Sequence, residues 1–233
     1  MQLTEAASKE AVIVENLWFK YSREYVLKGI SFTFNKRILV IVGPNGSGKT
    51  TLLKCMGGLL KPTRGKIIIL GKDLWSVDEK ERLELRRQII YVHEKPFLFR
   101  GTVYRNIEYP LKIRGISAGE RERRVLSVAE SLGIKHLLER KSRELSAGET
   151  RLVALARAIV VEPKYLLLDE PLANLDSKKE SLVLNLLKEI SSKTKIIIAS
   201  HRKRIFSIAE KTFILENGEL RELEVSSIEG NIL

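Results

Sequence analysis

The chain has 233 residues, enough to bury a full hydrophobic core, so we expect one compact unit with or without an inserted lobe. Its single cysteine, Cys55, excludes an internal disulfide and a multi-cysteine metal site, and no run of about 18 apolar residues indicates a membrane-spanning helix. The net charge of +12 suits anionic partners, but bases and acids are mixed in runs such as DEKERLELRR, which favours solvated helix faces over a nucleic-acid surface.

The strand-like segments are short and apolar. Residues 12–21 and 30–34 have the composition of antiparallel strands, and Asn217-Gly218 within residues 213–220 is typical of a hairpin. We expect these terminal segments to form a flanking antiparallel β layer. Continuous apolar runs predict strands covered on both faces, as in a parallel sheet between helices, over residues 37–42, 66–70, 88–92, 165–169 and 195–200.

Helical periodicity dominates the segment between these strands. Apolar residues recur at i, i+3, i+4 and i+7 in two stripes: Val125, Val128, Ala129 and Leu132, and Leu152, Leu155, Ala156, Ile159 and Val160. The second helix should begin at about Leu152 and end near Glu162, because Pro163 disfavours helical geometry before it. We predict a single domain: an α/β core of residues 1–92 and 163–233, and an inserted helical lobe of residues 93–162.

A phosphate-binding loop follows the strand at 37–42. VIVGPNGSGKTTLL matches G-x-x-x-x-G-K-[ST], and it lies between a strand and a helix, as the mechanism requires. Its glycines let backbone N–H groups converge on phosphate oxygens, Lys49 should reach the β- and γ-phosphates, and Thr50 offers a hydroxyl to Mg²⁺. The ATP-binding residues predicted here are Gly43, Pro44, Asn45, Gly46, Ser47, Gly48, Lys49, Thr50 and Thr51.

YLLLDEP supplies two carboxylates at the end of a buried strand. Asp169 should hold Mg²⁺ at the carboxyl edge of the sheet, where ligands of such folds bind. Glu170 is placed to orient the attacking water or accept its proton. Alone, the same residues would equally fit an ordinary strand end before a turn, and it is the phosphate-binding loop that favours the catalytic interpretation.

The stretch ELSAGETRL presents a second anion site. Ser146 and Glu149 form a capping-box pattern, which by itself explains the residues structurally. Ala147 and Gly148, however, leave helix N-terminal amides unshielded, as an anion site requires. One chain cannot easily wrap one ATP with both sites, whereas two chains placed head to tail can, each closing the nucleotide of the other.

The order GPNGSGKTT, LSAGE, YLLLDEP, ANLD and SH resembles the ATP-binding cassette (ABC) ATPases over essentially the whole chain. In that family the hydrolysing species is such a sandwich dimer. The resemblance implies that Tyr21 stacks on adenine, that His201 contacts the γ-phosphate and that Asp176 lies in a loop coupling the two sites. Without it, Tyr21 and His201 would be an ordinary strand aromatic and a strand-end histidine.

Three positions depart from the family pattern. Ala147 replaces a glycine and Glu149 a glutamine, and the capping geometry accepts both changes. Glu94 stands where the family places a glutamine that senses Mg²⁺ and the membrane partner. A carboxylate binds Mg²⁺ more strongly but adds negative charge near the γ-phosphate, so our hypothesis is that Glu94 is a conditional Mg²⁺ ligand.

The resemblance implies a Mg²⁺-dependent ATPase subunit that drives separate integral membrane subunits, as a homodimer or as a heterodimer with a related ATPase. Residues 96–115 match the family's groove for a helix of the membrane partner, and they favour import over export. The N-terminal segment MQLTEAASKE lacks the order of a secretory signal, so we expect a cytoplasmic protein, peripheral on the inner face of the cell membrane.

Two other classes stay open at this point. A non-transport ABC ATPase acting on ribosomes or DNA would suit the basic charge, but such proteins usually carry two cassettes or a long coiled coil, neither of which is visible here. We therefore expect no direct contact with nucleic acid. A nucleotide-binding switch without hydrolysis is disfavoured by Glu170 and His201.

Overall fold

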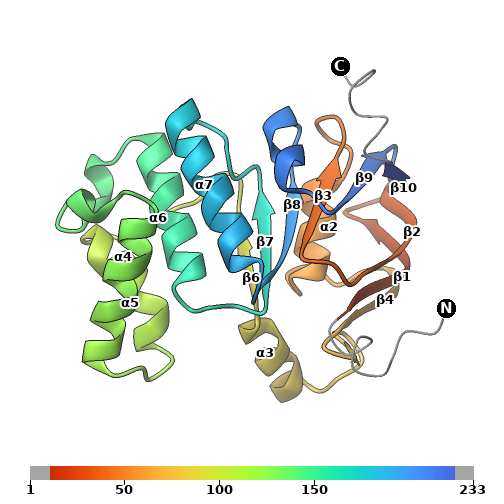
Figure 1. Cartoon of the computed structure of the whole chain (residues 1–233). Coiled ribbons are helices and arrows are strands. Elements are labelled where there is room, and N and C mark those ends of the chain that lie inside the picture. The colour runs from red at the N-terminus through yellow and green to blue at the C-terminus, as the bar shows by residue number, and fades with distance from the viewer. Residues whose placement is uncertain (1–10, 224–233) are drawn as a thin grey trace.

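The computed structural model describes residues 11–223, which form two sheets and a group of helices at one end (Figure 1). The larger sheet has six strands in the order β10-β9-β3-β8-β7-β6. β3, β6, β7, β8 and β9 run parallel, and β10 pairs antiparallel with β9 at the edge. The strands are β3 (Ile38–Val42), β6 (Ile89–Val92), β7 (Tyr165–Asp169), β8 (Lys195–Ala199), β9 (Lys211–Glu216) and β10 (Glu219–Leu223).

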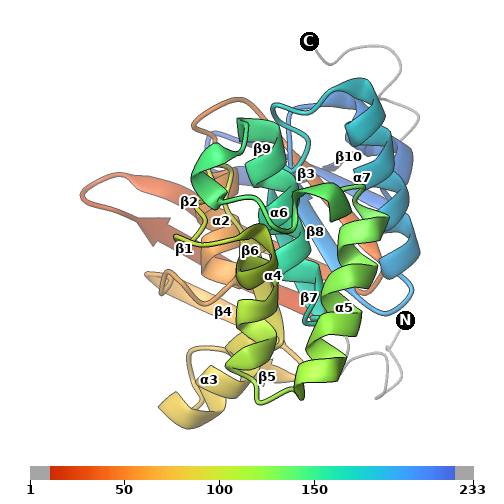
Figure 2. The ribbon, with the colours of Figure 1, turned by 90° about the vertical axis from the view of Figure 1, so that its left-hand side faces the viewer.

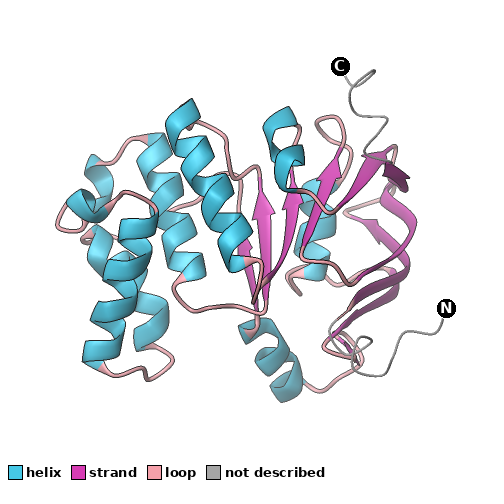
Figure 3. Ribbon diagram, viewed as in Figure 1, coloured by secondary structure: helices cyan, strands magenta, loops and turns pink. Residues whose placement is uncertain are grey.

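A four-stranded antiparallel sheet packs beside the larger sheet, in the order β2-β1-β4-β5 (Figure 3). Its strands are β1 (Val12–Lys20), β2 (Tyr25–Phe34), β4 (Arg64–Ile69) and β5 (Lys72–Asp73). α2 (Lys49–Met56) lies between the two sheets and α3 (Glu79–Arg87) near the end of the smaller one (Figure 1). The expected flanking β layer is confirmed for the N-terminal strands.

The remaining helices gather at the β6 end of the larger sheet. Viewed from that end, α4, α5 and α6 stand in front of the strands (Figure 2). The helices are α4 (Val103–Lys112), α5 (Ala118–Ser131), α6 (Ala147–Ile159) and α7 (Ser177–Ile190), with short 3₁₀ turns η1 (Lys135–Leu137), η2 (Ser142–Glu144) and η3 (Lys203–Ile208). No helix among residues 11–223 combines the length and apolar character needed to cross a membrane.

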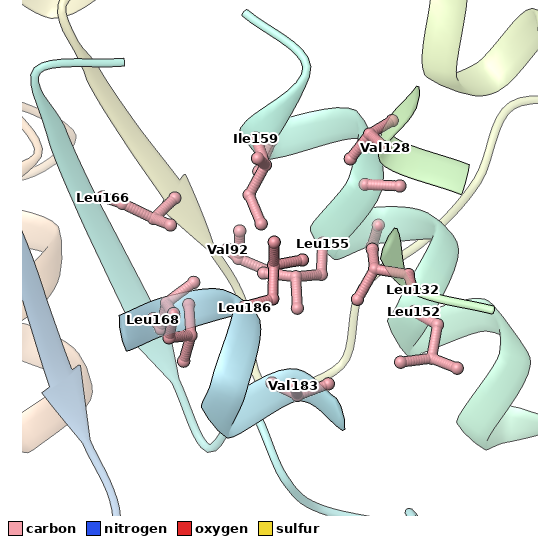
Figure 4. Close-up of a cluster of buried hydrophobic side chains, with 14 of the residues drawn as sticks. Val92, Val128, Leu132, Leu152, Leu155, Ile159, Leu166, Leu168, Val183 and Leu186 are labelled. Atoms are coloured by element: carbon pink, nitrogen blue, oxygen red, sulfur yellow. The ribbon is translucent and has the colours of Figure 1, made fainter. Parts of the chain in front are cut away.

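Apolar side chains cover both faces of the parallel sheet. All five residues of β3 and of β7 are buried, as their continuous apolar runs predict. On one face, alternate residues such as Leu166 and Leu168 pack with α5, α6 and α7 (Figure 4). On the other, Leu167 and its neighbours pack with α2, β1 and β2, and this core includes Cys55, whose thiol pKa burial raises to about 12.

Two strand predictions are wrong in placement. Residues 66–70 belong to the antiparallel sheet, because Ile67 and Ile69 face the core while Ile68 is only half-buried, so the apolar run conceals an alternating strand. The C-terminal hairpin does form at Asn217-Gly218, both with positive φ, but it extends the larger sheet instead of the flanking layer.

The limits of the helix after Ser146 also differ from the prediction. α6 begins at Ala147 and not near Leu152, because the capping box starts the helix directly after Ser146. It ends at Ile159, about a turn before Glu162, which is left-handed with φ 51°. The four helices α4 to α7 do not all belong to the segment 93–162, since α7 follows β7. Residues 1–10 and 224–233 of the predicted core lie outside the described residues.

Candidate active site

The phosphate-loop sequence leaves β3 and enters α2 directly. Val42 ends the strand and Lys49 begins the helix. At Gly43 (φ 150°) a Cβ would lie 2.1 Å from the carbonyl oxygen of Leu215 on β9, so only glycine lets the loop pass this close to the next strand. Gly48, the N-cap of α2, is left-handed with φ 105°, and it turns the loop over the start of the helix.

The N-terminus of α2 fits an anion. Its first turn contains no acidic residue, and Gly48 has no side chain to cap the amides. Within residues 11–223, the buried hydroxyl of Ser47 has no hydrogen-bond partner. Phosphate oxygens are acceptors that would satisfy the amides and this hydroxyl together. The loop therefore suits the phosphates of a nucleotide.

Lys49 lies inside this loop and not in solvent. Its ammonium donates to the carbonyl oxygens of Gly43 and Pro44, at 2.7 and 2.8 Å. Burial lowers the pKa of Lys49, and the negative charges of Glu170, Asp169 and Glu94 partly offset that effect. The charges of the three acidic residues predicted for the site thus all act on the predicted phosphate-binding lysine.

Asp169 ends β7 at the carboxyl edge of the sheet, and two hydroxyl groups bind it. Its Oδ2 accepts from Thr50 Oγ1 at 2.8 Å and from the Tyr91 hydroxyl at 3.0 Å. Burial and the nearby Asp169 raise the pKa of Tyr91, so its hydroxyl remains a donor. Tyr91, on β6, was not predicted as a site residue.

The Thr50–Asp169 pair fits Mg²⁺ and not a site formed by protein ligands alone. Residues 11–223 contain no group of three or more His, Cys, Asp or Glu able to hold a metal. Mg²⁺ commonly takes one or two protein ligands and completes its shell with substrate phosphates and water. The hydroxyl of Thr50 and the carboxylate of Asp169 provide this kind of donor set beside the phosphate loop.

Glu170 is held in one orientation by its neighbours. Its φ of 47° is in the left-handed region, which costs a non-glycine residue on the order of 1 kcal/mol. Oε2 accepts from the Ser200 hydroxyl at 2.9 Å, and Oε1 accepts from the backbone N–H of His201 at 3.0 Å and lies 2.7 Å from His201 Nδ1. The structure thus brings Glu170 and His201 together, and it adds Ser200, which was not predicted.

Glu94 and Glu170 share a buried guanidinium. Arg151 on α6 donates from Nη2 to the carbonyl oxygen of Glu94 at 2.6 Å and from Nη1 to that of Glu170 at 2.8 Å. The Glu94 side chain is exposed, and its charge acts on Lys49. Helical periodicity gave no signal for Arg151, because a charged residue on an otherwise apolar helix is normally assigned to its solvent face.

Tyr21 stands at the rim of the phosphate loop. It follows β1, its side chain is 63% exposed, and its hydroxyl lies 3.2 Å from Thr51 Oγ1. Phe19 supports the ring edge-on at a centroid distance of 4.9 Å. The open ring is available for stacking.

The N-terminus of α6 contains the capping box that the sequence predicts. Ser146 accepts from the backbone N–H of Glu149 at 3.2 Å, and the Glu149 carboxylate accepts from that of Ser146 at 2.8 Å. Ser146 and Ala147 are exposed, and Gly148 is buried against the carbonyl oxygen of Asn174. The start of α6 is therefore exposed at Ser146 and Ala147, and it packs against the backbone of Asn174 through Gly148.

The loop after β7 links the residues around Glu170 to the start of α7, where Asp176 lies. Asp176 is the N-cap of α7 and accepts from the backbone N–H of Lys179 at 2.9 Å, an interaction that lowers the pKa of Asp176. It lies two residues beyond Asn174, against which α6 packs. In Figure 1, strands β6, β7 and β8 lie between α6 and α2, the helix that follows the phosphate loop.

A second surface feature lies between the core and the helical lobe. Here a groove of about 450 Å³ has aromatic and aliphatic walls. Four of its side chains are large and at least 43% exposed: Phe97, Phe99, Tyr109 and Ile113. Such a cluster of exposed apolar side chains is typical of a binding surface. It falls within residues 96–115, where the sequence predicts contact with a membrane partner.

Comparison with known proteins identifies the family of the chain. A family model described as ABC transporter matches residues 27–173. The molybdate/tungstate import ATP-binding protein WtpC of Methanocaldococcus jannaschii is 38% identical over 202 residues, which cover 86% of this chain and 66% of WtpC. The chain therefore spans just under two thirds of the length of that relative.

Two further proteins share more of their length with the chain. The lipoprotein-releasing system ATP-binding protein LolD of Legionella pneumophila is 38% identical over 205 residues, which cover 85% of this chain and 90% of LolD. A dimeric structure of a post-hydrolysis state of the ATP-binding cassette MJ0796, bound to ADP and Pi, superposes with a TM-score of 0.86 at 29% identity, covering 92% of this chain and 98% of the other. The chain belongs to the ABC transporter family, as one of its nucleotide-binding cassettes.

Proposed function

We propose that this chain is the ATP-hydrolysing subunit of an ABC transporter, and that two cassettes close around two ATP molecules and reopen after hydrolysis. The observation that carries the proposal is the Glu170 carboxylate, which Ser200 and His201 hold in one orientation. It directly follows Asp169, whose carboxylate accepts from Thr50 of the phosphate loop at 2.8 Å. A switch that only binds nucleotide has no need for a fixed carboxylate in a strained backbone conformation.

Each residue then has a defined task. The loop amides and Lys49 bind the β- and γ-phosphates, and Tyr21 stacks on adenine. Glu170 orients the attacking water and accepts its proton, while His201, whose Nδ1 faces Glu170, presents its other ring nitrogen to the γ-phosphate. Thr50 and Asp169, with Glu94 as a conditional ligand, would hold Mg²⁺, which would supply positive charge to offset that of the phosphates.

A second cassette completes each site. Ser146 and Ala147 are exposed at the start of α6, and the amides there, with that of the buried Gly148, suit the γ-phosphate bound by a partner. The partner is a second copy or a related ATPase. Asp176, joined to α6 through the close contact of Gly148 with Asn174, is placed to couple the two sites.

The membrane subunits dock at the groove formed by Phe97, Phe99, Tyr109 and Ile113, which accepts a short apolar helix. This gives the protein its place, on the cytoplasmic side and peripheral to the membrane. We infer import as the direction of transport. The import protein WtpC supports it, whereas LolD, named for lipoprotein release at the same identity, supports the export alternative.

The substitution Glu170→Gln tests the proposal. It keeps the size of the side chain and the bond from Ser200 but removes the proton acceptor, so turnover should fall at least about 100-fold while ATP binding persists. The ATP-bound dimer should then accumulate and be visible by size-exclusion chromatography. Lys49→Ala, the matched control, should lose both ATP binding and the dimer.

Three results would contradict the proposal. Full turnover in Glu170→Gln would remove the catalytic role of the carboxylate. A variant that stays monomeric at high ATP and protein concentration would remove the shared site. Nucleic-acid binding that weakens steeply with added salt would instead indicate the non-transport class.

A further inference from the structure

Arg151 is a buried charge that the proposed reaction does not use. It lies on α6 five residues after Ser146 and is only 5% exposed. Its two terminal nitrogens bind the carbonyl oxygens of Glu170 and Glu94, and its Nε, also buried, has no partner within the described residues. One side chain from the lobe thus contacts the backbone of two proposed site residues.

Burial of this guanidinium is energetically unfavourable. Desolvation lowers the pKa of Arg151, and the negative charges of Glu94, Glu170 and Asp169 only partly offset that effect. The neighbouring Leu152, Val153 and Leu155 are apolar and buried, so an apolar side chain would suit the surroundings of α6. Simple packing of lobe on core therefore does not require an arginine at this position.

The contact with Glu170 bears on catalysis through the backbone. Glu170 is left-handed, and its N–H donates to the carbonyl oxygen of Ala199 at 2.9 Å. Arg151 Nη1 fixes the carbonyl on the other side of the residue. If that bond is lost, the carbonyl oxygen keeps only the backbone N–H of Ala173, at 3.2 Å. The backbone can then rotate about N–Cα towards an ordinary φ, which moves the carboxylate away from Ser200 and His201.

The contact with Glu94 involves the same rigid group. Because a guanidinium is planar, its two Nη donors keep a fixed relative geometry, and the carbonyl oxygens of Glu94 and Glu170 cannot shift independently while both are bound. The loop at Glu94 leads directly into the groove lined by Phe97 and Phe99. Movement at the groove can therefore reach Glu170 through a single side chain.

We propose that Arg151 is a positioning residue that aligns Glu170 for water activation only when the loop at Glu94 sits against α6. The inference rests on the proposed ATPase function and adds to it a link between the groove and the hydrolytic carboxylate. Arg151 touches neither substrate nor metal in this scheme. It acts through the backbone of the two residues it binds.

The test compares Arg151→Met with Arg157→Met. Arg157 lies on the same helix and also donates to a loop carbonyl, that of Phe97 at 2.9 Å, but it has no contact with Glu170. Arg151→Met should lower kcat by about 100-fold, the effect of misplacing a reacting group by about 1 Å, and leave KM for ATP within about threefold. Arg157 also lines the groove, but Arg157→Met leaves both bonds of Arg151 in place, so kcat should fall by no more than about threefold.

Arg151→Lys provides a second measurement if the methionine variant folds poorly. A lysine ammonium can bind one carbonyl but does not present the two-donor fork, so kcat should lie between those of the wild type and Arg151→Met, with unchanged ATP affinity. In addition, Glu170→Gln should form the ATP-bound dimer equally well with and without Arg151→Met, because the positioned carboxylate is already absent.

The outcomes separate the two proposals. If the wild type hydrolyses ATP and Arg151→Met keeps its kcat, the positioning role is refuted and the ATPase function stands. A fall in ATP affinity in place of kcat, or equal losses in Arg151→Met and Arg157→Met, refutes it as well. If the wild type itself does not hydrolyse ATP, the proposed function fails first.

Discussion

Two glycines at equivalent helix positions should respond oppositely to alanine. Gly148 is the second residue of α6, and Gly119 is the second residue of α5. A Cβ built on Gly119 has no heavy atom within 4 Å, whereas one built on Gly148 lies 2.7 Å from the carbonyl oxygen of Asn174 and 3.5 Å from Leu175 Cδ2. The pair thus shares its local propensity and differs in its surroundings.

The expected magnitudes follow from these distances. Alanine in place of an unobstructed helical glycine gains about 0.5–1 kcal/mol, which is our expectation for Gly119→Ala. In Gly148→Ala an ordinary contact begins at 3.4 Å, so two backbone segments have to separate by about 0.7 Å. Overpacking of this kind costs about 1–3 kcal/mol, and the gain in helix propensity reduces the net destabilisation to about 0.5–2 kcal/mol.

Urea unfolding followed by circular dichroism measures both changes, with an ATP-dependent dimerisation assay on the same samples. Gly148→Ala should unfold at lower urea concentration with an unchanged slope, and its dimer should weaken, because α6 or the Asn174–Asp176 loop has shifted. If Gly148→Ala is as stable as Gly119→Ala, the close approach of α6 to Asn174 does not exist in solution. Coupling of α6 to Asp176 through that contact would then be refuted as well.

Two other substitutions test single charges. Glu94→Gln should raise the Mg²⁺ concentration for half-maximal ATPase activity about 10-fold, since it removes a conditional ligand, and an unchanged Mg²⁺ dependence and turnover would discard that role. Glu149 has its pKa lowered, chiefly by the backbone N–H of Ser146, so its charge stabilises the fold above its ordinary pKa and stops doing so as pH falls through the lower folded value. The free energy of unfolding of the wild type should therefore exceed that of Glu149→Gln by up to about 1 kcal/mol near neutral pH, and the difference should vanish in acid. A difference in unfolding free energy that does not change with pH would contradict this assignment.

The sequence predicts those parts of the fold that depend on local pattern. β3 and β7 are buried on both faces because every residue is apolar or strand-terminal, and the capping box at Ser146 marks the start of α6. Residues 66–70 were assigned to the parallel sheet because Ile68 is apolar although it lies on the outer face of an antiparallel strand. This hides the alternation of apolar and polar residues that distinguishes antiparallel from parallel strands. Pairing partners depend on contacts distant in sequence, which a local pattern does not contain.

The candidate site shows the same division. Motif spacing identified Lys49, Asp169 and Glu170. In the structure both carboxylates act electrostatically on Lys49, and Thr50, the next residue, donates to Asp169. The sequence did not predict three residues of the site: Tyr91, Ser200 and Arg151. Each is of a type that is common in its strand or helix. Only the fold directs their polar atoms at Asp169, Glu170 and Glu94. A polar residue inside a buried apolar run, such as Tyr91, is the one sequence signal that was available.

The two bonds from Lys49 to Gly43 and Pro44 also have a consequence for the speed and selectivity of nucleotide capture. They cross-link the loop internally, which reduces the chain entropy that the loop can lose on binding. To bind the Lys49 ammonium, a triphosphate has to displace the two carbonyl oxygens. A highly charged anion binds the ammonium strongly enough to do so, whereas a neutral molecule does not. The loop therefore selects for highly charged anions, and the strength of the two Lys49 hydrogen bonds sets how strong that selection is.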